Sequence, residues 1–366
     1  MTIKQSFEGI VSIRRDHNGV LWSDPLNRKE PFFKLDRQTI KNYGLVNGAR
    51  VKAAVNGRTL NNIISVCGSE PQAFKSRRAF SSQPAAIPDQ RFDFGSTAYA
   101  SLRIIDMFMP IGFGTRALIV SPPRAGKTVI LEEMAKGLRE INQKLRIIAL
   151  LIDERPEEVT GFKMKTDALV LHRTLDQSTR SQVELSNLLI DHIQAEVEAG
   201  NDIVVLIDSL TRLSRSYNRS DNRSRGRTMS GGVGAGALEI PRKLFGLARN
   251  IQRGGSCTIL ATILRDTGSR MDEVIFQEFK GTGNSEIILD RELAENRIFP
   301  ALNLRESGTR KEELLLDPNY YETITALRRK LFTLNKDSVI VSLLNLFEKY
   351  VNNKELLDKY SAEISG

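Results

Sequence analysis

One short segment, SPPRAGKT at residues 121–128, constrains the fold of this 366-residue chain more than any other feature. It begins at the end of the apolar run ALIVS and leads into a stretch with helical spacing. In such a strand–loop–helix unit the backbone N–H groups and the helix N-terminus attract phosphate, Lys127 reaches the terminal phosphates and the Thr128 hydroxyl can bind Mg²⁺. Loops of this kind usually begin with Gly, whereas Ser121 stands here. The segment therefore predicts a nucleotide-binding loop with one departure from the general pattern.

Apolar runs and helical patterns alternate through the same part of the chain. The runs are rich in Val, Ile and Leu and lie at residues 117–121, 146–153, 202–208, 257–264 and 286–290. Near-continuous apolar strands separated by helices are typical of a parallel sheet that is covered on both faces. The sequence therefore predicts an α/β fold with a mostly parallel sheet.

Two carboxylates stand at the ends of these runs. Asp208 ends the run DIVVLID and Glu154 directly follows LLID. Ligands of open α/β sheets bind at the carboxyl ends of the strands, so we expect Asp208 to face Mg²⁺ and Glu154 to orient the attacking water. Either carboxylate alone would more often be a helix cap or a solvated loop residue. Together with Lys127 at the same edge, they predict a site for ATP and Mg²⁺.

The first 80 residues have a different sequence pattern, with short strand-like stretches separated by turns between Phe7 and Cys67. Asn18-Gly19 and Asn56-Gly57 are tight-turn signals, because both residue types tolerate positive φ. The pattern predicts a small OB-like β-barrel at residues 1–80. Residues 81–93 begin with the small, polar, Pro-bearing stretch SSQPAAIPDQ and are interpreted as a linker. Residues 94–366 then form the α/β domain, and their last stretch, 322–363, has helical spacing.

Charge and composition narrow the class of protein. Residues 1–80 contain 14 Lys and Arg against 6 Asp and Glu, which is most of the net charge of +9. This asymmetry favours a polyanionic partner, although the charge alone does not choose between RNA, DNA and acidic lipid, and a solvated basic face has the same composition. Cys67 and Cys257 stand alone, so neither disulfides nor a zinc site are expected. Neither a secretory leader nor an apolar run of about 18 residues is seen, and we expect a cytoplasmic protein without a membrane span.

Seven motifs give the chain a resemblance to a known family. They are LIVSPPRAGKT, LLIDERPEEVT, LIDSLTRLSRSYN, FGLARN, DTGSRMDEV, FKGTGN and SGTRKEELL. Together they resemble the Rho family of transcription termination factors, densely from about Phe94 to Leu315 and loosely from Phe7 to Val66. The resemblance implies a RecA-like P-loop ATPase domain behind an RNA-binding barrel. It also implies a homohexameric ring that hydrolyses ATP with Mg²⁺, translocates on single-stranded RNA and acts on the RNA polymerase elongation complex.

The resemblance also assigns roles to individual residues. It implies that Lys127 and Thr128 bind phosphate and magnesium, that Asp208 is the Walker B carboxylate and that Glu154 is the catalytic carboxylate. Arg310 would be the arginine finger that is supplied by the adjacent subunit. The remaining nucleotide contacts would be Pro123, Arg124, Ala125 and Gly126 in the loop, Arg155 and Arg212 as phosphate sensors, Arg297 at the subunit boundary and Phe299 on the adenine. The RNA contacts of the central channel would be Arg227, Thr228 and Ser230 in one loop and Arg270 in another. A solvated surface loop would have a similar composition.

The N-terminal region departs most from the family pattern. The family normally has a small helical segment ahead of the barrel, whereas Phe7 here already belongs to the expected barrel. The aromatic RNA-stacking turn is replaced by HNGVLW at residues 17–22. Trp22, Phe32 and Phe33 could substitute for it, but aromatic residues of small barrels are more often core.

Two other functions remain open at this level. One is a regulatory relative that binds nucleotide and RNA without full termination activity. The other is a rotary or secretion-type ATPase, which shares the RecA-like core, although PPRAGKT, LLIDERPEEVT, FKGTGN and the channel-loop arginines favour Rho.

Overall fold

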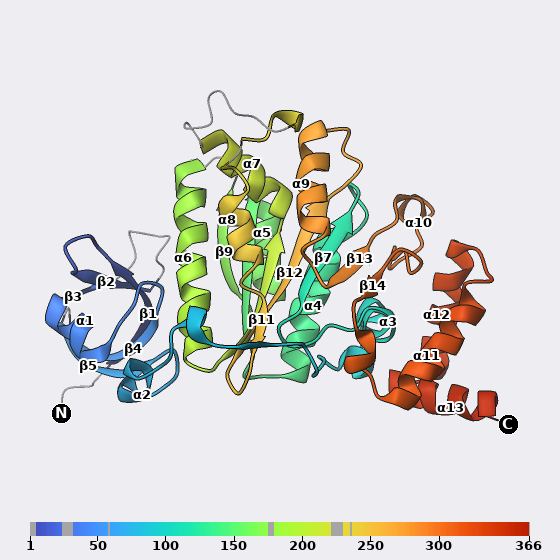
Figure 1. The fold of residues 1–366 in the computed structure, drawn as a ribbon, viewed down its shortest axis with the longest axis horizontal. Helices are drawn as coiled ribbons and strands as arrows, with labels where there is room; N and C mark the ends of the chain where they lie inside the picture. Colours follow the sequence, from blue (N-terminus) through green and yellow to red (C-terminus); the bar gives the residue numbers. More distant parts are fainter. Residues whose placement is uncertain are drawn as a thin grey trace.

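The structure is a computed structural model that describes residues 5–23, 32–57, 59–174, 179–220, 230–234 and 236–365. A small antiparallel sheet lies at one end, a large sheet flanked by helices lies in the middle, and a group of helices lies at the other end (Figure 1). The arrangement confirms the predicted α/β class with an OB-like unit at the N-terminus.

The N-terminal sheet has the strand order β3-β2-β1-β4-β5 and is antiparallel throughout. Its elements are β1 (Gln5–Ile13), β2 (Gly19–Trp22), β3 (Phe32–Leu35), α1 (Arg37–Tyr43), β4 (Arg50–Asn56) and β5 (Thr59–Val66). The first half of β1 pairs with β4 and the second half with β2, so this strand bends the sheet into a half-barrel. At the bend, a Cβ atom on Gly9 would lie 2.3 Å from the Trp22 carbonyl oxygen, which leaves room for glycine only.

The turn between β1 and β2 uses a different residue from the expected one. His17, rather than Asn18 or Gly19, adopts the positive φ, at 64°. Asp16 supports the turn by accepting hydrogen bonds from the backbone N and the Nδ2 of Asn18, each at 3.1 Å. The expected turn is thus present, and a side-chain bond on Asp16 fixes its conformation.

The segment that follows the half-barrel is more structured than a linker. It contains α2 (Pro71–Lys75), η1 (Phe80–Ser82), β6 (Ala85–Ala86) and η2 (Phe94–Ser96). The two residues of β6 pair with β11 (Arg249–Ile251), and β11 in turn pairs with β12. The predicted linker therefore adds a short strand to the large sheet.

The large sheet has the main order β14-β13-β7-β12-β10-β8-β9. Its strands are β7 (Arg116–Ser121), β8 (Arg146–Glu154), β9 (Leu169–Thr174), β10 (Asp202–Asp208), β12 (Ser256–Leu264), β13 (Ser285–Ile288) and β14 (Gly308–Thr309). The strands from β13 to β9 are parallel, whereas β14 is antiparallel. All five predicted apolar runs form strands of this sheet.

Helices cover both faces of the large sheet. Along β10, Val204 and Leu206 pack into one core and Ile203, Val205 and Ile207 into the other. The helices around the sheet are α3 (Ala100–Phe108), α4 (Lys127–Ile141), α5 (Pro156–Lys165), α6 (Thr179–Glu198), α7 (Leu210–Ser220), η4 (Ser230–Gly232), α8 (Glu239–Phe245), α9 (Arg270–Lys280) and α10 (Arg291–Glu295). Two apolar faces explain why the strands are almost continuously hydrophobic.

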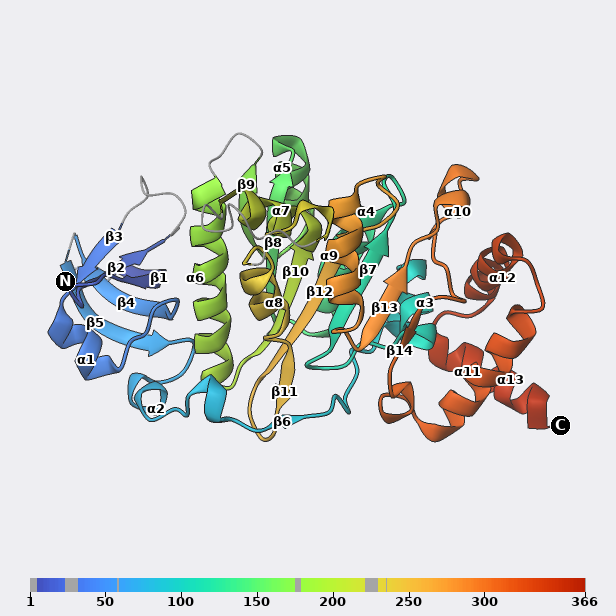
Figure 2. The ribbon, with the colours of Figure 1, turned by 45° about the horizontal axis from the view of Figure 1, so that its top comes forward.

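The C-terminal elements are η5 (Glu312–Leu314), α11 (Pro318–Leu331), α12 (Lys336–Lys349) and α13 (Asn353–Ser365). They lie at the end opposite the half-barrel in both views (Figure 2). Buried hydrogen bonds join them to α3, because Asn353 Nδ2 donates to the Arg103 carbonyl oxygen at 2.8 Å and to Asp106 Oδ2 at 3.0 Å. In the part of the chain that the structure describes, no helix has both the length and the apolar character of a membrane span.

A network of buried polar groups joins the half-barrel to α6. Arg50 Nε donates to Glu196 Oε1 at 2.7 Å, and the Glu196 side chain is fully buried. His192 Nδ1 lies 2.7 Å from the Gly48 carbonyl oxygen. Asn201 Nδ2 donates to the Cys67 carbonyl oxygen at 2.7 Å. Hydrogen-bonded charges of this kind fix one docking geometry, so the half-barrel has a defined position on the large domain.

Candidate nucleotide site

The predicted phosphate loop connects β7 to α4. The strand ends at Ser121 and the helix begins at Lys127. Two loop residues have positive φ, Arg124 at 66° and Gly126 at 94°. This backbone directs the start of α4 toward the carboxyl edge of the sheet, where an anion would meet the helix N-terminus.

Lys127 lies between two buried carboxylates. Its Nζ is 2.6 Å from Asp208 Oδ2 and 3.0 Å from Glu154 Oε1. Its Nζ also lies 3.4 Å from Thr128 Oγ1. The structure thus brings together the four residues that the sequence placed at this edge, although β12 separates β7 from β10 in the sheet. Burial lowers the pKa of Lys127, but Asp208 and Glu154 outweigh it, so the pKa is raised and the ammonium stays charged.

Asp208 also accepts a hydrogen bond from a threonine that was not predicted from the sequence. Thr262 Oγ1, on β12, donates to Asp208 Oδ1 at 2.8 Å. The side chains of both residues are buried. Thr262 interrupts the apolar run CTILATIL, and a buried hydroxyl in such a strand needs a partner. That interruption was the signal that could have identified it.

Glu154 has the most perturbed carboxyl group of the site. Burial and the neighbouring Asp208 carboxylate raise its pKa to about 7, and they outweigh the opposing effects of Lys127 and Arg212. Arg212 Nη1 lies 3.1 Å from Glu154 Oε1, and the same nitrogen donates to the Asp153 carbonyl oxygen. A carboxyl group with a pKa near neutrality suits general-base or water-orienting chemistry.

The residue before Glu154 connects the site to α7. Asp153 has a positive φ of 55°, and its Oδ2 lies 3.0 Å from Arg219 Nη2. Its Oδ1 accepts a hydrogen bond from Gln182 Nε2. Arg212 and Arg219 both lie on α7, so this helix contacts the end of β8 twice. Asp153 and Arg219 were not predicted from the sequence, because their contact depends on two separate elements.

The remaining predicted nucleotide contacts lie on the phosphate loop, at the start of α5 and after α10. Phe299 is 46% exposed, and its Cε1 would lie 4.0 Å from a Cβ atom on Gly126, so its ring stands beside the phosphate loop. Arg297 follows α10 with a φ of 60° and is exposed. Arg155 is exposed at the start of α5. In the loop, Pro123 and Arg124 are exposed, and Ala125 is buried.

Arg310 lies away from this cluster. It follows β14, and its backbone N donates to the Asn284 carbonyl oxygen at 2.8 Å. Asn284 precedes β13 and lies at the amino end of the parallel strands, whereas the phosphate loop follows their carboxyl ends. Arg310 is therefore at the opposite edge of the sheet from Lys127 in the same chain.

The predicted channel residues are only partly within the described residues. Arg227 and Thr228 lie outside them, and Ser230 belongs to η4. Arg270 is exposed at the first position of α9. A Cβ atom on Gly231 would lie 2.8 Å from the Arg270 carbonyl oxygen, so the end of one loop packs against the start of α9.

An ion pair between α7 and α9 supports the same contact between the two loops. Arg215 on α7 and Asp272 on α9 are paired, with Arg215 Nε at 2.8 Å from Asp272 Oδ1. Asp272 is buried. The helices that border the two loops are thus connected by a charge-assisted hydrogen bond.

The aromatic residues of the half-barrel divide into two groups. Phe33 is 7% exposed and packs edge-on against Phe7 at a centroid distance of 4.7 Å. Its ring therefore belongs to the core and presents no free face to a base. Trp22 and Phe32 are more exposed and lie 5.0 Å apart. The predicted RNA contact at Phe33 is thus better represented by its neighbour, Phe32.

The donors at the site suit Mg²⁺ that is held partly by nucleotide. The described residues hold no cluster of three or more His, Cys, Asp or Glu side chains that would form an all-protein metal site. Thr128 and Asp208 offer one hydroxyl and one carboxylate, both hard oxygen donors. Magnesium commonly takes one or two such ligands and completes its shell with phosphate and water.

These features define a P-loop ATPase with a RecA-like sheet. Residues 101–309 match the model of the "ATP synthase alpha/beta family, nucleotide-binding domain". Solved structures of type III secretion ATPases share the fold: a prototypical ATPase covers 86% of this chain and 94% of its own with a TM-score of 0.62 and 17% identity. The ATPase EscN from enteropathogenic E. coli covers 98% of both chains with a TM-score of 0.63 and 16% identity.

Sequence similarity identifies the family within this class. Transcription termination factor Rho of Streptobacillus moniliformis is 42% identical over 89% of this chain and 80% of its own length. Rho of Bacillus subtilis is 40% identical over 88% of this chain and 77% of its own. Rho of Mycobacterium tuberculosis is 44% identical over 82% of this chain and 50% of its own. The chain belongs to the Rho family.

Family membership decides between the readings left open by the sequence. The chain is an ATP-hydrolysing enzyme of the Rho type, as predicted. The secretion ATPases share its fold, but their identities of 16–17% are far below the 40–44% of these Rho proteins. The regulatory alternative without termination activity is not favoured.

Proposed function

We propose that this protein is an ATP-driven RNA translocase and helicase that works as a homohexameric ring in transcription termination. The observation that carries the proposal is the cluster of Lys127, Asp208, Glu154 and Arg212 at the carboxyl edge of the sheet. This cluster combines a phosphate-binding cation with a carboxyl group whose pKa is about 7. The family relationship supports the same chemistry.

Each residue of the cluster has a distinct task in ATP hydrolysis. Lys127 exchanges its present carboxylate partners for the terminal phosphates of ATP, and the α4 N-terminus adds backbone N–H donors. Thr128 and Asp208 would hold Mg²⁺, which would neutralise phosphate charge. Glu154 orients and polarises the attacking water, and Arg212 holds Glu154 in place. Phe299 packs on the adenine beside Gly126, while Arg155 and Arg297 contact phosphate and the subunit boundary.

Arg310 serves the site of a neighbouring subunit. It lies at the edge opposite its own phosphate loop, so it needs a second copy of the chain to meet a nucleotide. A guanidinium that reaches the γ-phosphoryl group stabilises its transition-state charge and is worth about 10³ to 10⁵ in rate. Hydrolysis would then depend on ring assembly.

RNA is bound by two regions of different character. Arg227, Thr228, Ser230 and Arg270 form the channel contacts to the phosphodiester backbone. The contact between Gly231 and Arg270 supports the view that both loops face one strand. The basic half-barrel attracts RNA phosphates, with Trp22 and its neighbour Phe32 as the exposed stacking surface.

The cellular setting follows from the same proposal. The protein acts in the cytoplasm on the RNA polymerase elongation complex, and residues 1–80, 81–93 and 94–366 serve as the RNA-binding barrel, the linker and the motor domain. Residues 81–93 contact the motor domain, because β6 pairs with β11 of its sheet.

A termination assay tests the whole proposal. Elongation complexes stalled on an untranslated, cytidine-rich transcript are incubated with the protein and ATP, and the released RNA is quantified. We expect release with ATP and none with a non-hydrolysable analogue. ATP-independent release, or no release under conditions where the protein hydrolyses ATP, would contradict the proposed role.

A further inference from the structure

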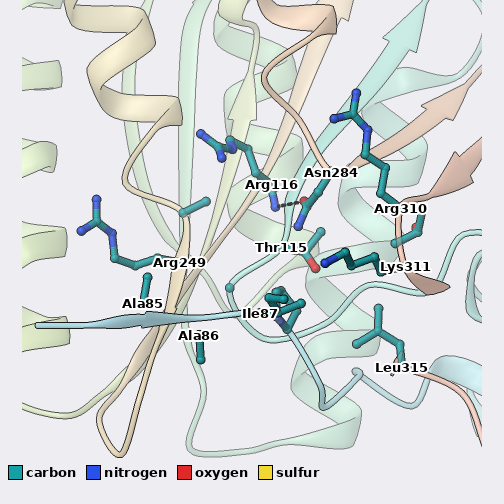
Figure 3. Close-up of a pocket in the computed structure, with 14 residues that line it drawn as sticks. Ala85, Ala86, Ile87, Thr115, Arg116, Arg249, Asn284, Arg310, Lys311 and Leu315 are labelled. Carbon is teal, nitrogen blue, oxygen red and sulfur yellow. Dashed lines mark hydrogen bonds between the residues drawn. The ribbon is translucent and has the colours of Figure 1, made fainter. Parts of the chain in front are cut away.

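A cavity of about 350 Å³ lies at the amino edge of the large sheet, far from Lys127. Arg116 at the start of β7 and Arg249 on β11 line one side, and Arg310 and Lys311 after β14 line another. The segment Ala85–Pro88 closes it as an apolar wall. Figure 3 shows Lys311 extending toward Thr115, with Arg116 and Arg249 beyond Thr115 and their guanidinium groups pointing away from Lys311.

The cavity holds four cationic side chains and no acidic one. Among the residues that the structure describes, none of the four forms an ion pair. Glu312, which follows closely in the sequence, is already paired with Arg328 at 2.9 Å. Most other buried or half-buried arginines of the described chain have a carboxylate partner, as Arg50 does in Glu196. Arg116 and Arg249 are half-buried, whereas Arg310 and Lys311 are exposed, so an anion in the cavity would chiefly balance the first two.

Burial makes it costly for the Arg116 guanidinium to lack an anionic partner. Arg116 is half-buried, and its Nε is fully buried without a hydrogen-bond partner among the described residues. Burial, followed by the charge of Arg249, lowers the pKa of Arg116. An oxyanion in the cavity would supply the missing acceptor and screen the two guanidinium groups from each other.

The frame around the cations is rigid. Arg116 N donates to Asn284 Oδ1 at 2.7 Å, and Arg310 N donates to the Asn284 carbonyl oxygen at 2.8 Å. The guanidinium of Arg249 is held 4.1 Å above the ring of Phe80. Lys311 has a left-handed φ of 58°. The backbone around the cations is therefore fixed, and the Arg249 guanidinium is positioned before any ligand arrives, which reduces part of the entropy cost of binding.

We infer that this cavity is a second phosphate site, distinct from the one at Lys127. Arginine forks match the oxygens of a phosphate group, and lysine adds a compact charge. The volume suits a small ligand such as phosphate or pyrophosphate, or the phosphate chain of a nucleotide. The site shares Arg310 with the proposed finger, so an anion bound here competes for that side chain.

Calorimetric titration of the full chain with pyrophosphate in metal-free, low-salt buffer tests the inference. The background variant Lys127→Ala removes phosphate binding at the nucleotide site and leaves Arg310 intact. We expect it to retain one pyrophosphate per chain. Adding Arg116→Gln and Lys311→Gln should weaken that binding by at least about tenfold, since each lost charge-assisted bond is worth roughly that much.

A charge-matched control makes the result specific. Arg329→Gln and Lys359→Gln in the same background remove two exposed cations at the far end of the chain and should change the affinity less than twofold. If Arg116→Gln folds poorly, Lys311→Gln alone, at an exposed residue, should still weaken pyrophosphate binding.

A parallel titration with ATP separates the sources of phosphate. Binding that depends on Arg116 and Lys311 identifies nucleotide phosphate, whereas binding of pyrophosphate alone identifies the free anion. Loss of all pyrophosphate binding in Lys127→Ala, or equal weakening by the control pair, would overturn the second site. Neither result would touch the proposed ATPase at Lys127.

Discussion

Arg310 and Lys127 lie at opposite edges of the same sheet. The backbone N of Arg310 bonds to the carbonyl oxygen of Asn284 before β13, whereas Lys127 begins the helix that follows the carboxyl end of β7. Because β7 and β13 are parallel neighbours, these positions are at the two ends of the same pair of strands. Arg310 therefore lies at the end of these strands opposite the phosphate loop of its own chain.

Mixed rings test whether Arg310 acts on a neighbour. Arg310→Ala subunits and Lys127→Ala subunits should each be inactive alone, with losses of about 10³ or more for Arg310→Ala. Mixing them should restore part of the ATPase rate, because some interfaces join an intact Lys127 to an intact Arg310. Failure to recover activity in rings verified to contain both subunits would exclude the trans arrangement.

Glu154→Gln and Lys127→Ala should abolish turnover by different routes. Glu154→Gln keeps the size of the side chain but loses the base, so we expect the ATPase rate to fall by about 10² to 10⁴ while ATP still binds. Lys127→Ala loses the phosphate contact, so ATP binding itself should weaken. Fluorescent-nucleotide titration alongside turnover separates the two effects. Rapid hydrolysis by purified Glu154→Gln would remove this residue from the catalytic role.

The pKa of Glu154 predicts a pH dependence. Burial and Asp208 raise that pKa to about 7, so the deprotonated, active form dominates above this pH and is lost as the pH falls through it. The value of kcat/KM for ATP, which reports on the free enzyme, should therefore drop about tenfold per pH unit on the acidic side. A profile that stays flat down to pH 5 would show that protonation of Glu154 does not limit hydrolysis.

The half-barrel should bind RNA weakly because its stacking surface is small. Trp22→Ala should cost about 1 to 3 kcal/mol of RNA affinity in the full protein, whereas Trp22→Phe keeps a ring and should cost less. Binding should also weaken steeply with salt, because the basic surface contributes through counterion release. Labelled cytidine-rich and adenosine-rich oligonucleotides at two salt concentrations provide the measurement. Unchanged affinity in Trp22→Ala would place base contacts elsewhere.

Local sequence patterns were enough to predict most of the fold. Continuous Val, Ile and Leu runs mark strands with two buried faces, and all five runs form strands of the central sheet, which also contains β9 (Leu169–Thr174). The short strands β6, β11 and β14 have two or three residues each, too few to establish a period. Their pairing depends on chain segments that are distant in sequence. For this reason the local pattern around Ala85–Ala86 indicates a linker rather than a strand.

In the site, too, residues marked by a local sequence pattern could be predicted, whereas contacts between distant segments could not. Lys127, Asp208 and Glu154 could be predicted because each ends or follows a recognisable strand. The polar side chain of Thr262 within an apolar run marks it as a candidate, but its pairing with Asp208 could not be predicted, since that depends on which strand lies next to β10. Phe32 and Phe33 are adjacent, and a one-residue change of register exchanges their faces, so only the structure shows that Phe33 is core.

The ATPase rate of the purified protein with and without cytidine-rich RNA distinguishes an RNA-dependent motor from an RNA-independent ATPase. We expect slow turnover without RNA, a severalfold or greater increase with it, and no activity in Glu154→Gln under either condition. Turnover that is indifferent to RNA in assembled rings, or activity that survives Glu154→Gln, would contradict an RNA-dependent motor built on this site.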